Sequence, residues 1–114
     1  MCKLGDIFWA TLPQIPGSHV QQGEKPRPII ICSNNDCCKF SPTIHVIPLT
    51  SKMKKRYLPT HVTFSGFGLP EPCMALAEQL MIIDQKFLTQ HIGNMAESSV
   101  FVDIQKAIKI QLAI

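Results

Sequence analysis

The stretch Arg27-Pro28-Ile29-Ile30-Ile31-Cys32-Ser33-Asn34-Asn35 holds an apolar run that starts after a proline and ends in turn-forming residues. Such a run is typical of a strand buried on both faces, so we expect a strand over 29–32. A second apolar run, 44–49, ends at Thr50. A permanently charged arginine before one strand and a hydroxyl after the next are suited to hold an anion. Phosphate is the expected anion because basic residues follow at once: Lys52, Lys54, Lys55 and Arg56.

The length and composition indicate one folded domain that spans residues 1–114. Hydrophobic residues make up 46% and charged residues 17% of the chain, as in globular proteins rather than disordered tails. No apolar stretch approaches the roughly 18 residues that cross a bilayer, and Asp6 interrupts the region where a signal peptide needs an apolar core. We therefore expect a cytoplasmic protein without a membrane partner.

The five cysteines form no CxxC pair, so no metal site is expected. No cofactor is expected either. We expect Cys32 and Cys73 to act as small apolar residues in strands, and Cys37-Cys38 to lie in a loop.

Positive charge gathers in the first half of the chain. Residues 1–62 carry eight Lys/Arg against three Asp/Glu, whereas 63–114 carry three against five. This asymmetry favours a surface that faces a polyanion such as nucleic acid. Charge runs are more often solvated faces, so charge alone favours nucleic acid only slightly.

The rest of the pattern predicts a mainly β domain. Strands are expected over 6–12, 29–32, 43–49, 61–64 and 74–83, the last with a bend near Glu78-Gln79. Loops are expected over 13–28, 34–41 and 66–72, where Pro, Gly and Asn gather, and over the basic segment 52–56. The expected architecture is a small, strongly curved sheet or barrel with a helix packed on it.

The chain changes period toward its C-terminus. Asp84 is expected to cap a short helix that runs to about His91. Asn94 with Glu97 has the spacing of a capping box. The apolar residues that follow keep a helical spacing to the end: Phe101, Ile104, Ile108 and Leu112.

Each candidate site residue also has an ordinary structural explanation. A lone arginine is most often a surface residue in an ion pair, although Pro26 and Pro28 stiffen the backbone on both sides of Arg27. Thr50 at a strand end most often caps the next turn, and Ser18 is a turn residue before it is a hydroxyl donor.

Histidine and aromatic residues give weaker signals. His19, His45, His61 and His91 suggest a two-histidine ribonuclease, but no spacing links them. Trp9 is expected in the core, and Tyr57, which follows the basic run, is the best candidate to stack on a base.

Taken together and in order, these motifs resemble the MazF/PemK toxin family over nearly the whole chain. The matching segments are Gly5-Asp6-Ile7-Phe8-Trp9, Gly17-Ser18, Arg27-Pro28, Ser33-Asn34-Asn35, Phe40-Ser41-Pro42-Thr43, Pro48-Leu49-Thr50-Ser51, Leu58-Pro59-Thr60-His61-Val62, Glu78-Gln79 and Ile83-Asp84. Each is weak alone, but the ordered set is highly specific.

The resemblance implies a compact SH3-like barrel, the MazF/CcdB-type plasmid maintenance toxin fold, with a C-terminal helix. It implies a toxin of a toxin–antitoxin pair that cuts single-stranded RNA, usually mRNA, at short sequences without a metal. The RNA 2′-hydroxyl is the nucleophile, and the products carry a 2′,3′-cyclic phosphate and a 5′-hydroxyl. The implied assembly is a homodimer that binds a MazE-like antitoxin, with DNA binding in the antitoxin complex. Translation and growth then stop.

The resemblance also assigns residues. Arg27 matches the catalytic arginine and Thr50 the catalytic threonine, while Ser18 and Gln79 match residues near the RNA. We add Lys25, Lys52, Lys54 and Tyr57 as expected RNA contacts from the basic segments. The loop before Arg27 is longer than usual in the family, and Lys25-Pro26 competes with Arg27-Pro28 for the catalytic position. The apolar strand that directly follows Pro28 decides for Arg27.

Two other functions remain open at this point. A related toxin of this fold poisons DNA gyrase by binding it through C-terminal residues, and it needs no Arg/Thr pair. A barrel that binds RNA without cutting it is the third reading. The presence of both Arg27 and Thr50 favours the nuclease.

Overall fold

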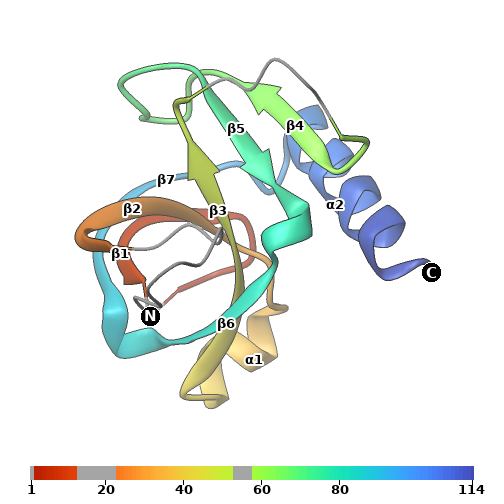
Figure 1. Cartoon of the computed structure of the whole chain (residues 1–114). Coiled ribbons are helices and arrows are strands. Elements are labelled where there is room, and N and C mark those ends of the chain that lie inside the picture. The colour runs from red at the N-terminus through yellow and green to blue at the C-terminus, as the bar shows by residue number, and fades with distance from the viewer. Residues whose placement is uncertain (1, 13–22, 53–57) are drawn as a thin grey trace.

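A computed structural model describes residues 2–12, 23–52 and 58–114 of the chain. Within this part no helix has both the length and the apolar character needed to cross a membrane. Figure 1 shows a bent sheet with a short helix near one end and a longer C-terminal helix beside it. In chain order the elements are β1 (Asp6–Leu12), β2 (Gly23–Ile31), α1 (Asn35–Phe40), β3 (Thr43–Thr50), β4 (His61–Phe64), β5 (Cys73–Leu76), η1 (Ala77–Gln79), β6 (Met81–Asp84), η2 (Gln85–Phe87), β7 (Leu88–Asn94) and α2 (Ser99–Leu112).

The strands pair antiparallel in the order β4-β5-β3-β2-β1-β7, and β6 pairs with β3 outside this path. Among the described residues no strand pair joins β4 to β7, so the sheet curls without closing into a ring. The expected mainly β class with a C-terminal helix is confirmed.

β3 is the central strand of the sheet. One edge pairs with β2, and the other pairs first with β6 and then with β5. The strand expected over 74–83 is thus two strands along one edge of β3, separated by the 3-10 turn η1. The expected bend near Glu78 is confirmed.

The continuous apolar run in β2 is explained by two cores. Ile30 packs into a cluster with Phe101 of α2, whereas Ile29 and Ile31 pack into a second cluster with Cys38 of α1. All three isoleucines are fully buried. Burying each side chain contributes roughly 1.5–3 kcal/mol, so this strand is strongly fixed in register.

Four local expectations were wrong. β2 begins at Gly23, well inside the expected loop over 13–28, because it pairs with β1 as far as Leu12. Residues 35–40 form α1 rather than a connector, since the Asn34 side chain accepts a hydrogen bond from the Cys37 N–H at 2.8 Å. Cys37 and Cys38 therefore lie on a helix.

The other two errors lie near the C-terminus. Asp84 does cap a turn, but that turn is only η2, and His91 lies on β7 beside β1. The N-cap of α2 is Ser98, whose Oγ accepts from the Phe101 N–H at 3.1 Å. Asn94 instead accepts from the Ala96 N–H at 2.8 Å.

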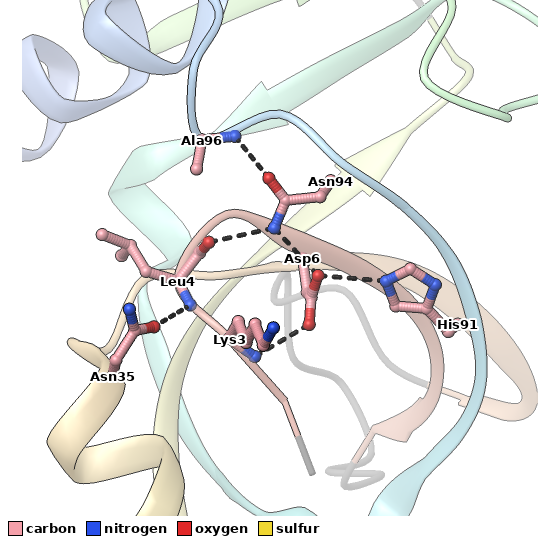
Figure 2. Close-up of polar contacts among 7 residues, drawn as sticks. All are labelled: Lys3, Leu4, Asp6, Asn35, His91, Asn94 and Ala96. Atoms are coloured by element: carbon pink, nitrogen blue, oxygen red, sulfur yellow. Dashed lines mark hydrogen bonds and ion pairs between the residues drawn. The ribbon is translucent and has the colours of Figure 1, made fainter.

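A buried carboxylate joins the N-terminus to β7 (Figure 2). Asp6 Oδ2 accepts from the Lys3 N–H at 2.8 Å, and Oδ1 accepts from Asn94 Nδ2 at 2.9 Å and lies 3.0 Å from His91 Nε2. Asn35 adds a bond from α1, because its Oδ1 accepts from the Leu4 N–H at 2.8 Å. These contacts fix the start of β1, the strand that supports β2.

Candidate active site

Arg27 and Thr50 lie at the same end of two neighbouring strands. β2 and β3 pair Ile29 with Pro48 and Ile30 with Ile47. Continuing this register toward the start of β2 sets Arg27 across from Thr50. Residues that are far apart in sequence are thus brought together by an antiparallel pairing that the buried isoleucines hold in place.

Both residues line one pocket of about 170 Å³. β1, β2, the end of β3 and the connection between β4 and β5 all contribute to its wall. The aromatic, polar and charged side chains of this wall are Trp9, Arg27, Thr50, Ser51, Lys52, Glu71 and Cys73. A small pocket with two cations and two hydroxyls is suited to bind a phosphate group.

Thr50 is nearly buried, with 8% of its surface exposed. Its Oγ1 accepts a hydrogen bond from the Lys52 N–H at 3.1 Å. The capping role expected for a strand-end threonine is therefore real. A hydroxyl that accepts one bond keeps its own hydrogen, so Thr50 still has a donor for a ligand in the pocket.

Arg27 is exposed, and its backbone lies between two prolines on β2. It forms no salt bridge with any residue that the structure describes. The ordinary explanation of a surface ion pair therefore finds no support in that part of the chain. A guanidinium at a pocket wall can donate two parallel hydrogen bonds to phosphate oxygens.

The other expected site residues are distributed differently. Lys52 lines the pocket, Lys25 is exposed on β2 outside the pocket wall, and Gln79 lies in η1, also outside the wall. Ser18, Lys54 and Tyr57 lie outside the described residues.

Sequence reasoning missed two residues of the pocket. Trp9 was expected in the core, but it is half-buried and lines the pocket. Glu71 was not considered, although Pro70 and Pro72 flank it just as Pro26 and Pro28 flank Arg27. That repeated Pro-charge-Pro pattern was the available signal.

Cys73 contributes a buried thiol to the pocket wall. Burial raises its pKa, and the nearby Glu71 carboxylate raises it further. The thiol therefore stays protonated at neutral pH and is a poor nucleophile. Its Sγ also contacts the backbone carbonyl of Glu71 at 3.5 Å, which ties Glu71 to the start of β5.

Residues 3–112 match the family model described as PemK-like, MazF-like toxin of type II toxin–antitoxin system. The chain is 32% identical to the endoribonuclease EndoA of Bacillus subtilis, covering 98% of this chain and 95% of that one. It is 31% identical to the endoribonuclease MazF of Staphylococcus epidermidis, covering 100% and 93%.

Solved structures share the fold. MazF from Deinococcus radiodurans superposes with a TM-score of 0.81 at 22% identity, over 99% of this chain and 97% of that one. An endoribonuclease from a mycobacterial species, in complex with its cognate antitoxin, gives 0.76 at 17% identity, over 100% and 97%.

The fold and the family model define one class of protein, a small toxin of a type II toxin–antitoxin pair. The chain belongs to the PemK-like, MazF-like toxin family of type II toxin–antitoxin systems.

Proposed function

We propose that this protein is a metal-independent endoribonuclease toxin that cuts single-stranded RNA at short sequences. The observation that carries the proposal is the convergence of Arg27 and Thr50 on one pocket, in a chain of this family. Two relatives at 31% and 32% identity are named endoribonucleases, which supports the same activity.

The reaction proposed is attack by the RNA 2′-oxygen on the adjacent phosphorus. The bond from O2′ to phosphorus forms, the bond from phosphorus to O5′ breaks, and the products are a 2′,3′-cyclic phosphate and a 5′-hydroxyl. Negative charge grows on the nonbridging oxygens in the transition state. Arg27 and the Thr50 hydroxyl donate hydrogen bonds to these oxygens and stabilise that charge.

Arg27 acts here by electrostatic stabilisation. A guanidinium is a poor proton acceptor, but a strong bidentate donor to phosphate. DNA lacks the 2′-hydroxyl, so the same pocket does not cut it.

Basic residues around the pocket are proposed to hold the flanking RNA. Lys52 lies in the pocket wall. Lys25 lies two residues before Arg27, so strand periodicity sets both on one face of β2, where Lys25 contacts a neighbouring phosphate. Ser18, Lys54, Tyr57 and Gln79 complete the proposed RNA contacts.

The biological role proposed is that of a growth-arresting toxin. Cleavage of mRNA in the cytoplasm stops translation, and a MazE-like antitoxin neutralises a toxin homodimer. Solved relatives in complex with an antitoxin support such a partner.

The experiment is to incubate the purified protein with single-stranded RNA in EDTA and to identify the product ends. We expect cleavage of RNA, a cyclic phosphate at the 3′ side, a free 5′-hydroxyl, and no cleavage when the 2′-hydroxyl is replaced by hydrogen. Sequencing the new 5′ ends gives the recognition sequence. Intact RNA with a folded, antitoxin-free protein would contradict the proposal.

Arg27→Ala separates this function from poisoning of gyrase. The nuclease loses toxicity with this change and keeps its antitoxin binding. A toxin that acts by binding a protein target elsewhere on its surface stays toxic.

A further inference from the structure

The chemistry proposed above leaves one requirement unmet, because something must take the proton from the 2′-hydroxyl. Among the described residues of the pocket wall, the titratable groups are Arg27, Lys52, Glu71 and Cys73. Arginine and lysine are protonated at neutral pH and accept no proton. The raised pKa of Cys73 keeps its thiol protonated as well. Glu71 is the single carboxylate in this set.

Glu71 comes from a part of the chain remote from Arg27 and Thr50. It lies in the connection between β4 and β5, and β5 pairs with the end of β3 through Thr50 and Met74. That pairing brings the connection over the same pocket. Glu71 is exposed to solvent, so a substrate can reach its carboxylate.

The connection that carries Glu71 is braced against the body of the molecule. A Cβ at Gly93 of β7 would collide with the Phe67 carbonyl, and one at Gly68 would lie 2.7 Å from the Ile92 carbonyl oxygen. Phe67 also packs edge-on against Phe64, with ring centroids 6.0 Å apart. The backbone of this connection therefore lies directly on β7.

Local sequence stiffens the chain at Glu71 itself. Pro70 and Pro72 fix φ on both sides. The Cys73 thiol contacts the Glu71 carbonyl. Glu71 and Arg27 are thus two opposite charges in one pocket, each held between prolines, which is the preorganisation that acid–base catalysis needs.

We propose that Glu71 is the general base of this endoribonuclease. The inference rests on the proposed function. The Glu71 carboxylate takes the proton of the 2′-hydroxyl while O2′ bonds to phosphorus. The bond to O5′ breaks, O5′ takes a proton from water, and the protonated Glu71 returns its proton to solvent. Arg27 and Thr50 stay on the nonbridging oxygens throughout.

The other titratable groups of the pocket wall come from three parts of the chain. Arg27 lies on β2, Lys52 directly follows β3, and Cys73 begins β5. The Glu71 carboxylate and a bound phosphate both carry negative charge and repel each other. Removing the carboxylate charge is therefore expected to leave RNA binding unchanged or tighter while catalysis falls.

The test is single-turnover cleavage of one single-stranded RNA by wild type, Glu71→Gln, Glu71→Asp and the control Glu97→Gln. Glu97 is exposed and lies outside the pocket wall. We expect Glu71→Gln to lower the cleavage rate about 10²- to 10³-fold, Glu71→Asp to recover part of it, and the control to match wild type. Affinity for the same RNA with a 2′-deoxy group at the cut site should be equal or higher in Glu71→Gln.

The pH dependence gives a second readout. The wild-type rate should rise with pH on the acidic side and then level off, and Glu71→Gln should lose that rise. A wild-type rate in Glu71→Gln overturns the proposal, as does weaker binding or altered sequence preference with an unchanged rate. If wild type itself leaves RNA intact, the proposed function fails first, so the two failures are distinguishable. Thermal unfolding of each variant shows whether a lost rate reflects a lost fold.

Discussion

Arg27 and Thr50 face each other across β2 and β3 when the register of the buried pairs is continued to the strand ends, and both line one pocket. The arginine is exposed and the threonine nearly buried. An exposed, permanently charged donor and a nearly buried hydroxyl thus lie at the place where a phosphate is proposed to bind.

Replacing Arg27 tests the electrostatic role. We expect Arg27→Ala to lower the rate of RNA cleavage about 10²- to 10³-fold, because a preorganised donor to the transition state is lost. Arg27→Lys should recover only part, since lysine lacks the bidentate fork. Lys25→Ala is the matched control and should mainly weaken RNA binding, with a smaller salt dependence of affinity. If Lys25→Ala abolished RNA cleavage while Arg27→Ala remained active, Lys25 and not Arg27 would hold the catalytic role.

Thr50 is tested by changes of similar size. Thr50→Val keeps the shape and removes the hydroxyl, so cleavage should fall by about 10²-fold or more. Thr50→Ser keeps the hydroxyl and should stay within about tenfold of wild type. Rates are measured at saturating RNA, and circular dichroism checks the fold. Equal activity of Val and Ser variants would remove the hydroxyl from the mechanism.

The Asp6 carboxylate should matter for stability rather than for chemistry. Asp6→Ala removes the acceptor of the Lys3 N–H and one of the two acceptors of the Asn94 amide, so we expect a loss of about 1–3 kcal/mol in the free energy of unfolding. His91→Ala is the control, because the His91 side chain is 51% exposed and should cost only about 0–1 kcal/mol. Urea unfolding measures both. Equal losses of unfolding free energy in the two variants would show that the cost does not come from the hydrogen bonds of Asp6 to Lys3 and Asn94.

Gly93 holds the connection between β4 and β5 against β7. Its substitution by alanine sets a Cβ against the Phe67 carbonyl, so we expect a loss of about 1–3 kcal/mol in stability and a reduced cleavage rate as Glu71 shifts. Gly66 in the same connection has open space around it and a φ of +97°. Gly66→Ala should therefore cost only backbone strain of about 1–2 kcal/mol. A Gly93→Ala protein as stable as wild type would contradict this packing.

Alkaline pH should destabilise the fold through Cys38. The pKa of Cys38 is raised from 9.0 to about 12. Burial is the largest cause, and a hydrogen bond with the Cys2 thiol is the next. The unfolded chain then loses this proton at lower pH than the folded chain. Stability from this group is full below pH 9.0 and is lost as pH rises from there toward 12. Cys38→Ala should flatten the fall in melting temperature over that range, and Cys37→Ala should not.

Hydrophobic periodicity predicted the elements whose residues follow one repeating pattern of apolar and polar side chains. The alternating and continuous apolar runs identified β1, β4 and most of β3, and the helical spacing identified α2. The sequence failed where tertiary pairing overrides local signals. The start of β2 is rich in proline and glycine but becomes a strand because β1 pairs with it. Likewise η2 and β7 replace the expected helix after Asp84, since the edge of β1 is filled by β7.

The candidate site was predictable only in part for the same reason. Arg27 and Thr50 were named as candidates from their positions at strand ends and from the family pattern, and both line one pocket. Glu71 was not, because its connection to the pocket depends on the pairing of β5 with β3 and on the packing of Phe67 over Gly93. No spacing in the sequence expresses those contacts.

The three isoleucines of β2 pack into two cores, and this arrangement affects a shift in strand register differently from a change in length before the strand. A shift of β2 by one residue would exchange its two faces and remove Arg27 from the pocket. The packing of the isoleucines in the two cores therefore fixes the position of Arg27. Insertions in the sequence before β2 do not alter the register that this packing sets. The segment before β2 can therefore change in length while Arg27 keeps its place at the pocket.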